Sequence, residues 1–599
     1  MCGFFFSNNI NKGKDLAKIR EIERILKNRG PDNRKTIFLK KSVLSFSRLS
    51  IIDRSNRANQ PYSDFSKRYF LLFNGEIYNY QILKDQLIKN GIKFKTKSDT
   101  EVLFKLLVNF GIDDTLKKIE GMFSFIFYDK KKQSLVGARD HFGQKPFYYC
   151  RYKKRILIST NIGCIKLFLK ENAIDKDAIK TYISTRGLHN PQNTFFKLIK
   201  KLRAGHKFKL ENGKIKISRY FNPINLFSKK LSDRYKKISQ LEREELLSNK
   251  ISDSIRLNLL SDAPIGVCFS GGVDSTLAYY YASKEKYNLP IYSSFSKGIE
   301  KITFKYIPKL TKKLKIKKTN YVINEKNKYL LELSKLINYS KNVATWGGGP
   351  PMSFLCKKAR KNNSLVLLSG DGLDEINLGY LTHQNLINRF RGNLYDQNVA
   401  FQINPQSPFY ASKACKKYSS FLNKERKNDL NKIKKIYLNN ITKKELFIKS
   451  LIIQDLGIFL QSCTLHHSDE YSMFNSIEMR QPFINIELIR FLINQPIKFL
   501  FNKKLNKPLI RYLFNKKIGK KFTDIKKEGT RNYSKYISNK NFWNFDKFLT
   551  LKIFKVNISN IKDYRIIFNF INTEIFYRMC VLNSSNFDTI VKNKSILKR

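Results

Sequence analysis

The most informative stretch of this sequence is Ser270-Gly271-Gly272-Val273-Asp274-Ser275. It follows the apolar run 265–269 and precedes the apolar run 277–281. We expect a buried strand, a tight glycine turn and a helix that begins on a hydroxyl cap. Such a turn presents main-chain N–H groups at the positive end of a helix, where anions bind.

Asp274 would repel a phosphate unless a cation lies between them, and a magnesium–nucleotide complex removes that conflict. The stretch lacks the Gly-Lys-Ser/Thr ending of a Walker loop. It resembles the pyrophosphate-binding loop of enzymes that split ATP into AMP and pyrophosphate. The alternative is a glycine turn that only joins a strand to a helix. The resemblance implies ATP contacts from Cys268, Ser270, Gly271, Gly272, Asp274 and Ser275.

A second strand–loop unit occupies 365–375, where Leu-Val-Leu-Leu is followed by Ser-Gly-Asp-Gly-Leu-Asp-Glu. Loops at the carboxyl ends of strands in one parallel sheet face a shared crevice. Three acidic side chains so close together need a cation or donors, although a solvated acidic turn is the alternative. The stretch resembles a motif of asparagine synthetases. The resemblance implies nucleotide contacts from Ser369 and Gly370, and a role for Asp371 in forming an acyl-adenylate.

Two lysines and a pair of metal-binding aspartates complete the expected ATP site. Lys507 begins Lys-Pro-Leu-Ile-Arg, which looks like the family's Lys-x-Leu-Leu-Arg, and Lys297 follows the run 292–296. Both are assigned to ATP, although in a lysine-rich chain a stray lysine is the alternative. Asp274 and Asp374 are the expected ligands of Mg²⁺.

Cys2 would carry its own base if Met1 were removed. The freed α-amino group has a pKa of about 7.7–8, so one residue would supply both nucleophile and proton acceptor. An ordinary second-position cysteine is the alternative. Four further stretches favour the nucleophile: Arg29-Gly30-Pro31-Asp32, a strand expected over 47–53, Asn74-Gly75 as a hairpin signal, and a helix capped at 98–101.

Together these stretches resemble the glutaminase domain of amidotransferases that use an N-terminal cysteine nucleophile. The resemblance makes Cys2 the nucleophile, and it places Asn74 and the Gly75 N–H in an oxyanion hole. Arg48 would hold the glutamine α-carboxylate, and Asp99 its α-ammonium. The expected glutamine-binding residues are Arg48, Leu49, Ser50, Ile51, Ile52, Asn74, Gly75, Glu76 and Asp99.

The expected fold combines α+β and α/β domains. The resemblance implies an N-terminal αββα sandwich of antiparallel sheets over residues 1–215. A polar linker at 216–238 would lead to a parallel-sheet ATP-pyrophosphatase domain with added helices over 239–530. Residues 531–599 form an extension whose role the sequence does not reveal. A length of 599 residues requires at least two domains.

Composition excludes several classes of protein. The net charge is +66, but lysine is spread over every segment, so we expect no specific nucleic-acid partner. The eight cysteines form no CxxC pair, which argues against a disulfide scaffold or a zinc site. No apolar run approaches the roughly 18 residues that span a bilayer, and the N-terminus has no basic leader. We expect a cytoplasmic protein without a membrane partner, and a homodimer remains open.

The resemblance predicts an enzyme that forms an amide from glutamine-derived ammonia and an ATP-activated carboxylate. Its substrates would be glutamine, Mg-ATP and an acceptor, with aspartate leading. The chain departs from the family at 342–352, at Lys297 and at Leu373, all on the acceptor side. A non-aspartate acceptor, such as a sugar acid, is therefore the first alternative. The second is a catalytically dead fold that binds nucleic acid or serves as a scaffold.

Overall fold

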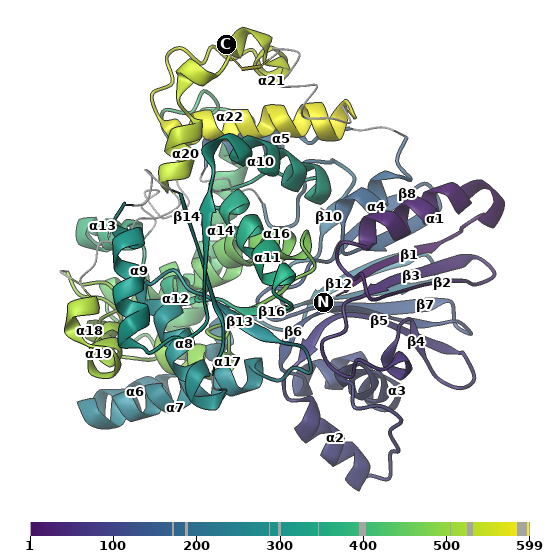
Figure 1. Cartoon of the computed structure of the whole chain (residues 1–599), viewed down its shortest axis with the longest axis horizontal. Helices are drawn as coiled ribbons and strands as arrows, with labels where there is room; N and C mark the ends of the chain where they lie inside the picture. The colour runs from purple at the N-terminus through teal and green to yellow at the C-terminus, as the bar shows by residue number, and fades with distance from the viewer. Residues whose placement is uncertain are drawn as a thin grey trace.

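The computed structural model describes residues 2–170, 173–185, 190–286, 288–296, 301–345, 347–394, 403–503, 505–523, 531–583 and 596–597. In Figure 1 two stacked sheets form one side of the molecule, and a third sheet lies among helices on the other side. Lys297 lies outside the described residues.

The first two sheets are antiparallel and have six strands each. Strand β1 shows how their faces form, because Phe4 and Phe6 point into the core between the sheets whereas Phe5 packs with a different cluster. Helices α1 (Lys12–Leu26) and α4 (Ile162–Lys166) lie outside one sheet, and α2 (Tyr80–Lys89) and α3 (Asp99–Lys118) lie outside the other. This is the expected αββα sandwich. The strands, in sheet order, are β10 (Lys200–Lys201), β8 (Tyr148–Tyr152), β9 (Arg155–Ser159), β1 (Gly3–Asn8), β3 (Ser42–Arg48) and β2 (Asn33–Phe38), then β12 (Lys214–Arg219), β11 (His206–Glu211), β7 (Ser134–Arg139), β6 (Gly121–Asp129), β5 (Tyr69–Ile77) and β4 (Tyr62–Ser63).

Two local expectations in this half were wrong. Asn74-Gly75 forms no hairpin turn but lies inside β5, where Gly75 pairs with Phe123 of β6. The tight packing explains this, because a Cβ at Gly75 would lie 2.0 Å from the Met122 carbonyl oxygen. The strand expected over 47–53 ends at Arg48, and the chain then forms a loop.

The third sheet is parallel, as expected, and its strand order is β15-β14-β13-β16-β17. The order reverses between β13 and β16, so ligands are expected at the carboxyl ends of these two strands. The strands are β13 (Ile265–Cys268), β14 (Ile291–Ser296), β15 (Thr319–Asn324), β16 (Val366–Leu368) and β17 (Glu478–Arg480). The helices of this half are α6 (Lys229–Lys237), α7 (Gln240–Asn258), α8 (Val273–Glu285), α9 (Lys301–Lys313), α10 (Lys326–Ser340), α11 (Gly349–Lys361), α12 (Leu373–Ile376), α13 (Leu381–Arg389), α14 (Lys413–Ile436), α15 (Lys443–Gln454), α16 (Leu465–Met473), α17 (Ile486–Ile493), α18 (Ile497–Leu500) and α19 (Pro508–Lys517).

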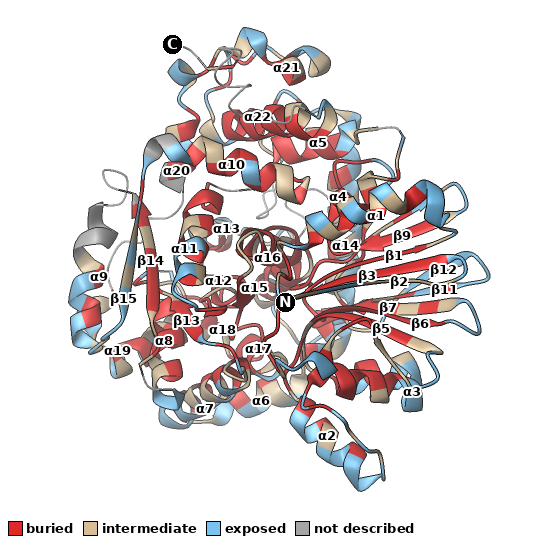
Figure 2. Ribbon diagram, turned by 45° about the vertical axis from the view of Figure 1, so that its right-hand side comes forward, coloured by how far each residue is buried: buried red, intermediate tan, exposed pale blue. Residues whose placement is uncertain are grey.

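Residues 443–473 form a continuous helical stretch at the centre of the molecule. It consists of α15, a π-helical segment (Asp455–Thr464) and α16. By length and composition alone this stretch could cross a membrane, although it contains no unbroken apolar run of the length considered above. Inside the protein, however, 89% of its apolar window is buried, as the red ribbons in Figure 2 show. It is the core helix of the second half.

The C-terminal helices are α20 (Arg531–Ile537), α21 (Leu549–Phe554) and α22 (Tyr564–Phe576), and α20 and α21 pack on α22. Helix α22 contacts α5 (Lys176–Ser184), which follows the first sandwich, and also α10 from the second half. Ile179, Leu333 and Ile571 share one apolar cluster there. The segment between the halves is also packed, because α6 buries Tyr235 against the core.

Candidate active sites

Cys2 lies at the start of β1, and its side chain is 7% exposed. Its main-chain nitrogen, a peptide N–H while Met1 is attached, donates to Asn74 Oδ1 at 2.9 Å. Burial raises the pKa of the Cys2 thiol above its usual value. A buried thiol of this kind needs a nearby base to become a nucleophile.

A pocket opens beside Cys2 and contains most of the predicted glutamine-binding residues. Of that set, Ser50 and Asn74 are the two that do not line it. Sequence reasoning missed Gln60, whose amide group pairs with the main chain of Phe73. The lining residues are Cys2, Arg48, Leu49, Ile51, Ile52, Gln60, Phe73, Gly75, Glu76, Ser98, Asp99 and Thr100.

The two ionic side chains assigned to glutamine have different surroundings. Asp99 accepts a hydrogen bond from the Ile77 N–H at 3.0 Å, and burial raises its pKa to about 6. The Arg48 guanidinium donates to the Ser55 carbonyl and to Asn59 Oδ1, each at 2.8 Å. Arg48 therefore also fixes the loop that forms one wall of the pocket.

The predicted pyrophosphate-binding loop, residues 270–275, joins β13 to α8 as expected, with Gly271 at φ +70°. Its serine hydroxyls point at each other, because Ser270 Oγ lies 3.0 Å from Ser275 Oγ. The helix begins on Gly272 without a side-chain cap, so the expected hydroxyl cap was wrong. Ser275 instead turns back towards Ser270 and the Gly272 carbonyl.

The second loop lies directly against the first. A Cβ at Gly370 would lie 2.7 Å from the Ser275 nitrogen, so only glycine allows this approach. Ser369 Oγ donates to Asp371 at 2.9 Å. Burial, followed by the charge of Asp374, raises the pKa of Glu375 to about 7. Thr464 and Tyr380 donate to its carboxylate at 2.7 and 2.8 Å.

Lys507 connects the two loops. Its ammonium lies 2.7 Å from both oxygens of Asp274 and 2.5 Å from Asp374 Oδ1. The side chain is 4% exposed, so a buried cation lies between the two carboxylates. Carboxylate oxygens are also the ligands that Mg²⁺ prefers, so Asp274 and Asp374 fit the predicted metal pair by donor type, although here the Lys507 ammonium occupies the space between them.

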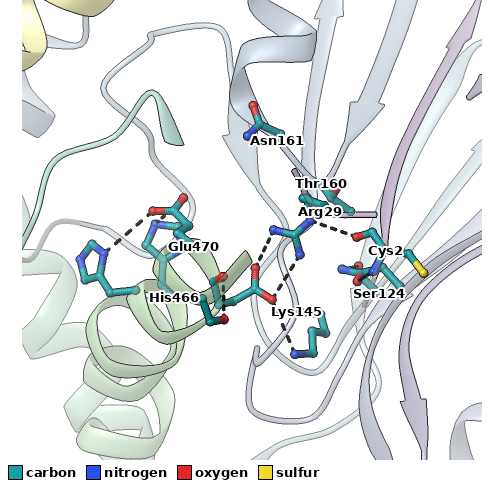
Figure 3. A network of polar contacts seen from close by, with 12 residues as sticks. Cys2, Arg29, Ser124, Lys145, Thr160, Asn161, His466 and Glu470 are labelled. Atoms are coloured by element: carbon teal, nitrogen blue, oxygen red, sulfur yellow. Dashed lines mark hydrogen bonds and ion pairs between the residues drawn. The ribbon is translucent and has the colours of Figure 1, made fainter. Parts of the chain in front are cut away.

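Polar residues between the two sites were not predicted as functional. Arg480 of β17 bonds Glu478 at 2.6 Å and lies 3.6 Å from Glu76 at the glutamine pocket. Burial, followed by the charge of Glu478, raises the pKa of Glu76 well above its usual value. Arg29 joins the Cys2 carbonyl to Asp469 of α16 (Figure 3). Arg29 belongs to the predicted Arg29-Gly30-Pro31-Asp32 turn, but a contact across 440 residues leaves no local signal in the sequence.

His466, His467 and Glu470 form the candidate metal cluster among the described residues. Both histidine Nε2 atoms accept hydrogen bonds: His466 from the Asn342 amide group at 2.6 Å and His467 from the Thr345 N–H at 3.3 Å. The Val343 N–H donates to Asn342 Oδ1, which orients that amide group. A neutral His467 then carries its proton on Nδ1, the atom that faces Glu470, so the cluster fits a hydrogen-bond network better than a metal.

Comparison with known proteins agrees with both halves. Residues 1–221 match the family described as "Glutamine amidotransferase domain", and residues 246–542 match "Asparagine synthase". "Asparagine synthetase [glutamine-hydrolyzing] 1" of Bacillus subtilis is 31% identical over 391 residues, or 63% of this chain and 59% of that protein. "Putative asparagine synthetase [glutamine-hydrolyzing] 2" of Methanocaldococcus jannaschii is 31% identical over 415 residues, or 64% of this chain and 76% of that protein.

A relative with a different name is "Amidase chry2" of Gibberella zeae, which is 28% identical over 254 residues, or 42% of this chain and 36% of that protein. The chain thus spans about three fifths of the Bacillus subtilis relative and three quarters of the archaeal one. The two family matches follow one another along the chain, one over each candidate site. The chain therefore belongs to the glutamine-hydrolysing asparagine synthetase family.

Proposed function

We propose that this protein hydrolyses glutamine at Cys2 and uses the released ammonia to amidate a carboxylate that ATP has activated. The leading reaction converts aspartate, glutamine and ATP into asparagine, glutamate, AMP and pyrophosphate. The observation that carries the proposal is the pairing of two sites on one chain. One is a pocket beside Cys2 that contains most of the predicted glutamine-binding residues, and the other is a pair of loops joined by Lys507.

At the first site, removal of Met1 turns the Cys2 nitrogen into an amine, held by Asn74 Oδ1, that takes the thiol proton. The thiolate then attacks the glutamine amide carbon. Asn74 Nδ2 and the Gly75 N–H stabilise the oxyanion, an effect typically of about 10²–10³ in rate. Asp99 and Arg48 hold the α-ammonium and α-carboxylate of glutamine.

At the second site, the loop 270–275 holds the pyrophosphate end of ATP, and Ser369 and Gly370 contact the nucleotide. Adenylation is needed because a free carboxylate is a poor electrophile. Asp371 assists it, and Lys507 stabilises negative charge on the phosphates. Asp274 and Asp374 would hold Mg²⁺, which supplies charge neutralisation to the nucleotide when bound.

The acceptor is the least constrained part of the proposal. Aspartate is favoured by the family, whereas the altered segment 342–352 favours keeping another carboxylate as the alternative. A cytoplasmic location accords with eight cysteines that carry no disulfide.

The test is to incubate the protein with glutamine, Mg-ATP and L-aspartate. The expected products are AMP and asparagine. Cys2→Ala should lose glutamine-dependent synthesis but retain synthesis from free ammonia. Glutaminase activity without asparagine would exclude aspartate as the acceptor, and loss of both activities in a folded Cys2→Ala protein would contradict the two-site reaction. Mass spectrometry of the N-terminus establishes whether Met1 is removed.

A further inference from the structure

We propose that Asp469, on helix α16 of the second half, is a positioning residue for the Cys2 nucleophile and acts through Arg29. This inference rests on the proposed glutaminase function and concerns how that site is held. Asp469 does not line the glutamine pocket, and neither does Arg29. Their effect must therefore pass through the main chain of Cys2.

The link consists of two consecutive contacts. Arg29 Nε donates to the Cys2 carbonyl oxygen at 3.0 Å. The two terminal nitrogens of the same guanidinium donate to the two oxygens of Asp469, at 2.8 and 3.2 Å. This bidentate geometry fixes both the distance and the orientation of Arg29. Figure 3 shows Arg29 between Cys2 and the helix that carries His466 and Glu470.

Both residues of this link are buried. Arg29 is 1% exposed and Asp469 is 2% exposed, so water cannot replace either partner. Burial alone would lower the pKa of Arg29, but the charge and the hydrogen bond of Asp469, together with the nearby Tyr339 and Glu470, raise the pKa above its usual value. Lys145, also buried, adds a second positive charge 3.6 Å from the Asp469 carboxylate. Removing that carboxylate would leave Arg29 charged and unpaired, and the guanidinium would have to move.

The same helical stretch also reaches the ATP side. Thr464, five positions before Asp469, ends the π-helical segment and donates to Glu375 in the acidic loop at 2.7 Å. π-Helical segments often occur at functional sites. The buried helical stretch 443–473 thus contacts the acidic loop through Thr464. Through Asp469 and Arg29 it also reaches the main chain of Cys2. The glutaminase site is complete only when the second half is docked.

Asp469 is one of several residues that join the two halves. Gln144 donates to Gln481 at 3.0 Å, and Arg203 pairs with Glu425 at 2.9 Å, both across the same interface. Arg203→Met therefore serves as the matched control, because it removes an ion pair between the halves that does not touch Cys2.

The test compares Asp469→Asn, Arg29→Lys and Arg203→Met with the wild-type enzyme. The readouts are kcat and KM for glutamine hydrolysis, AMP formation from free ammonia, and the rate of Cys2 alkylation by iodoacetamide. Asp469→Asn and Arg29→Lys should each lower kcat about 10- to 100-fold, because small displacements of reacting groups have effects of this size. KM and ammonia-dependent AMP formation should stay within about twofold, and Arg203→Met should match the wild type.

Wild-type glutaminase kcat in Asp469→Asn would overturn the proposal. So would equal loss of both activities in Asp469→Asn and Arg203→Met, since that result indicates a purely structural interface. If Asp469→Asn does not fold, Arg29→Lys tests the link from the other side. If the wild type hydrolyses no glutamine, the proposed function fails, yet the alkylation rate of Cys2 still shows whether Asp469 positions it.

Discussion

At the scale of single residues, the Asp99 carboxyl group is the proposed partner of the α-ammonium group of glutamine. Burial raises its pKa from an ordinary 3.8 to about 6. The carboxyl group is therefore neutral below about pH 6 and charged above it. Only the charged form can pair with the α-ammonium group of glutamine.

We therefore predict that KM for glutamine rises as the pH falls below about 6, by about tenfold for each further pH unit. The measurement is the pH profile of glutamine hydrolysis between pH 5 and 8. Asp99→Asn should raise KM at neutral pH and remove this dependence. A wild-type KM that stays constant down to pH 5 would contradict the role of Asp99.

Several site residues could be predicted from the sequence because they lie in short motifs, and Cys2, Gly75 and Asp99 do line one pocket. The partners of these residues could not be predicted. Arg48 donates to loop carbonyls, and Arg29 pairs with a residue 440 positions away. Such contacts depend on the tertiary fold rather than on any local pattern.

At the scale of elements, the two loops of the ATP side approach each other more closely than side chains would allow. Gly370 packs on the main chain of Asp274 and Ser275 at the first turn of α8. The closeness follows from the adjacency of β13 and β16 in the sheet. A shared crevice for the two loops was expected from two apolar runs that each end in a loop. The full strand order was not, because strand pairing is non-local.

We predict that Gly370→Ala abolishes most ATP-dependent activity and spares glutamine hydrolysis. The new Cβ would lie 2.7 Å from the Ser275 nitrogen and would push the loops apart. The expected loss of AMP formation is about 100-fold, the size seen when preorganised donors are displaced. Gly13→Ala is the control, since its Cβ meets only Asn11 Oδ1 at 3.6 Å. Equal loss of glutamine hydrolysis in Gly370→Ala would count against separate sites.

At the scale of the whole molecule, the C-terminal helices bind the two halves together. Asn569 of α22 is 3% exposed, and its amide group donates to the carbonyls of Tyr182, Ile183 and Thr185 at 3.0, 3.4 and 3.3 Å. This region of the sequence contains no recognisable motif. Helix α22 nevertheless packs against α5 of the first half and α10 of the second (Figure 1).

We predict that Asn569→Leu destabilises the contact between α22 and α5 by about 1–3 kcal/mol, because buried carbonyls lose their donor. Faster hydrogen exchange in α5 and α22 is the measurement. Asn572→Leu is the matched control, because among the described residues the Asn572 amide group bonds only the Phe568 carbonyl of its own helix and its Oδ1 has no partner. If the two variants exchange alike, α22 does not hold α5 through Asn569.

The central claim is that the two halves form one enzyme, and a nitrogen-tracing experiment tests it most directly. The protein is incubated with glutamine labelled with ¹⁵N at the amide, Mg-ATP and L-aspartate, in the presence of unlabelled ammonium. We predict AMP together with asparagine that carries ¹⁵N in its amide, with little dilution by the external ammonium. Asparagine that carries only unlabelled nitrogen, or ¹⁵N-ammonia released with no labelled amide formed, would contradict the account.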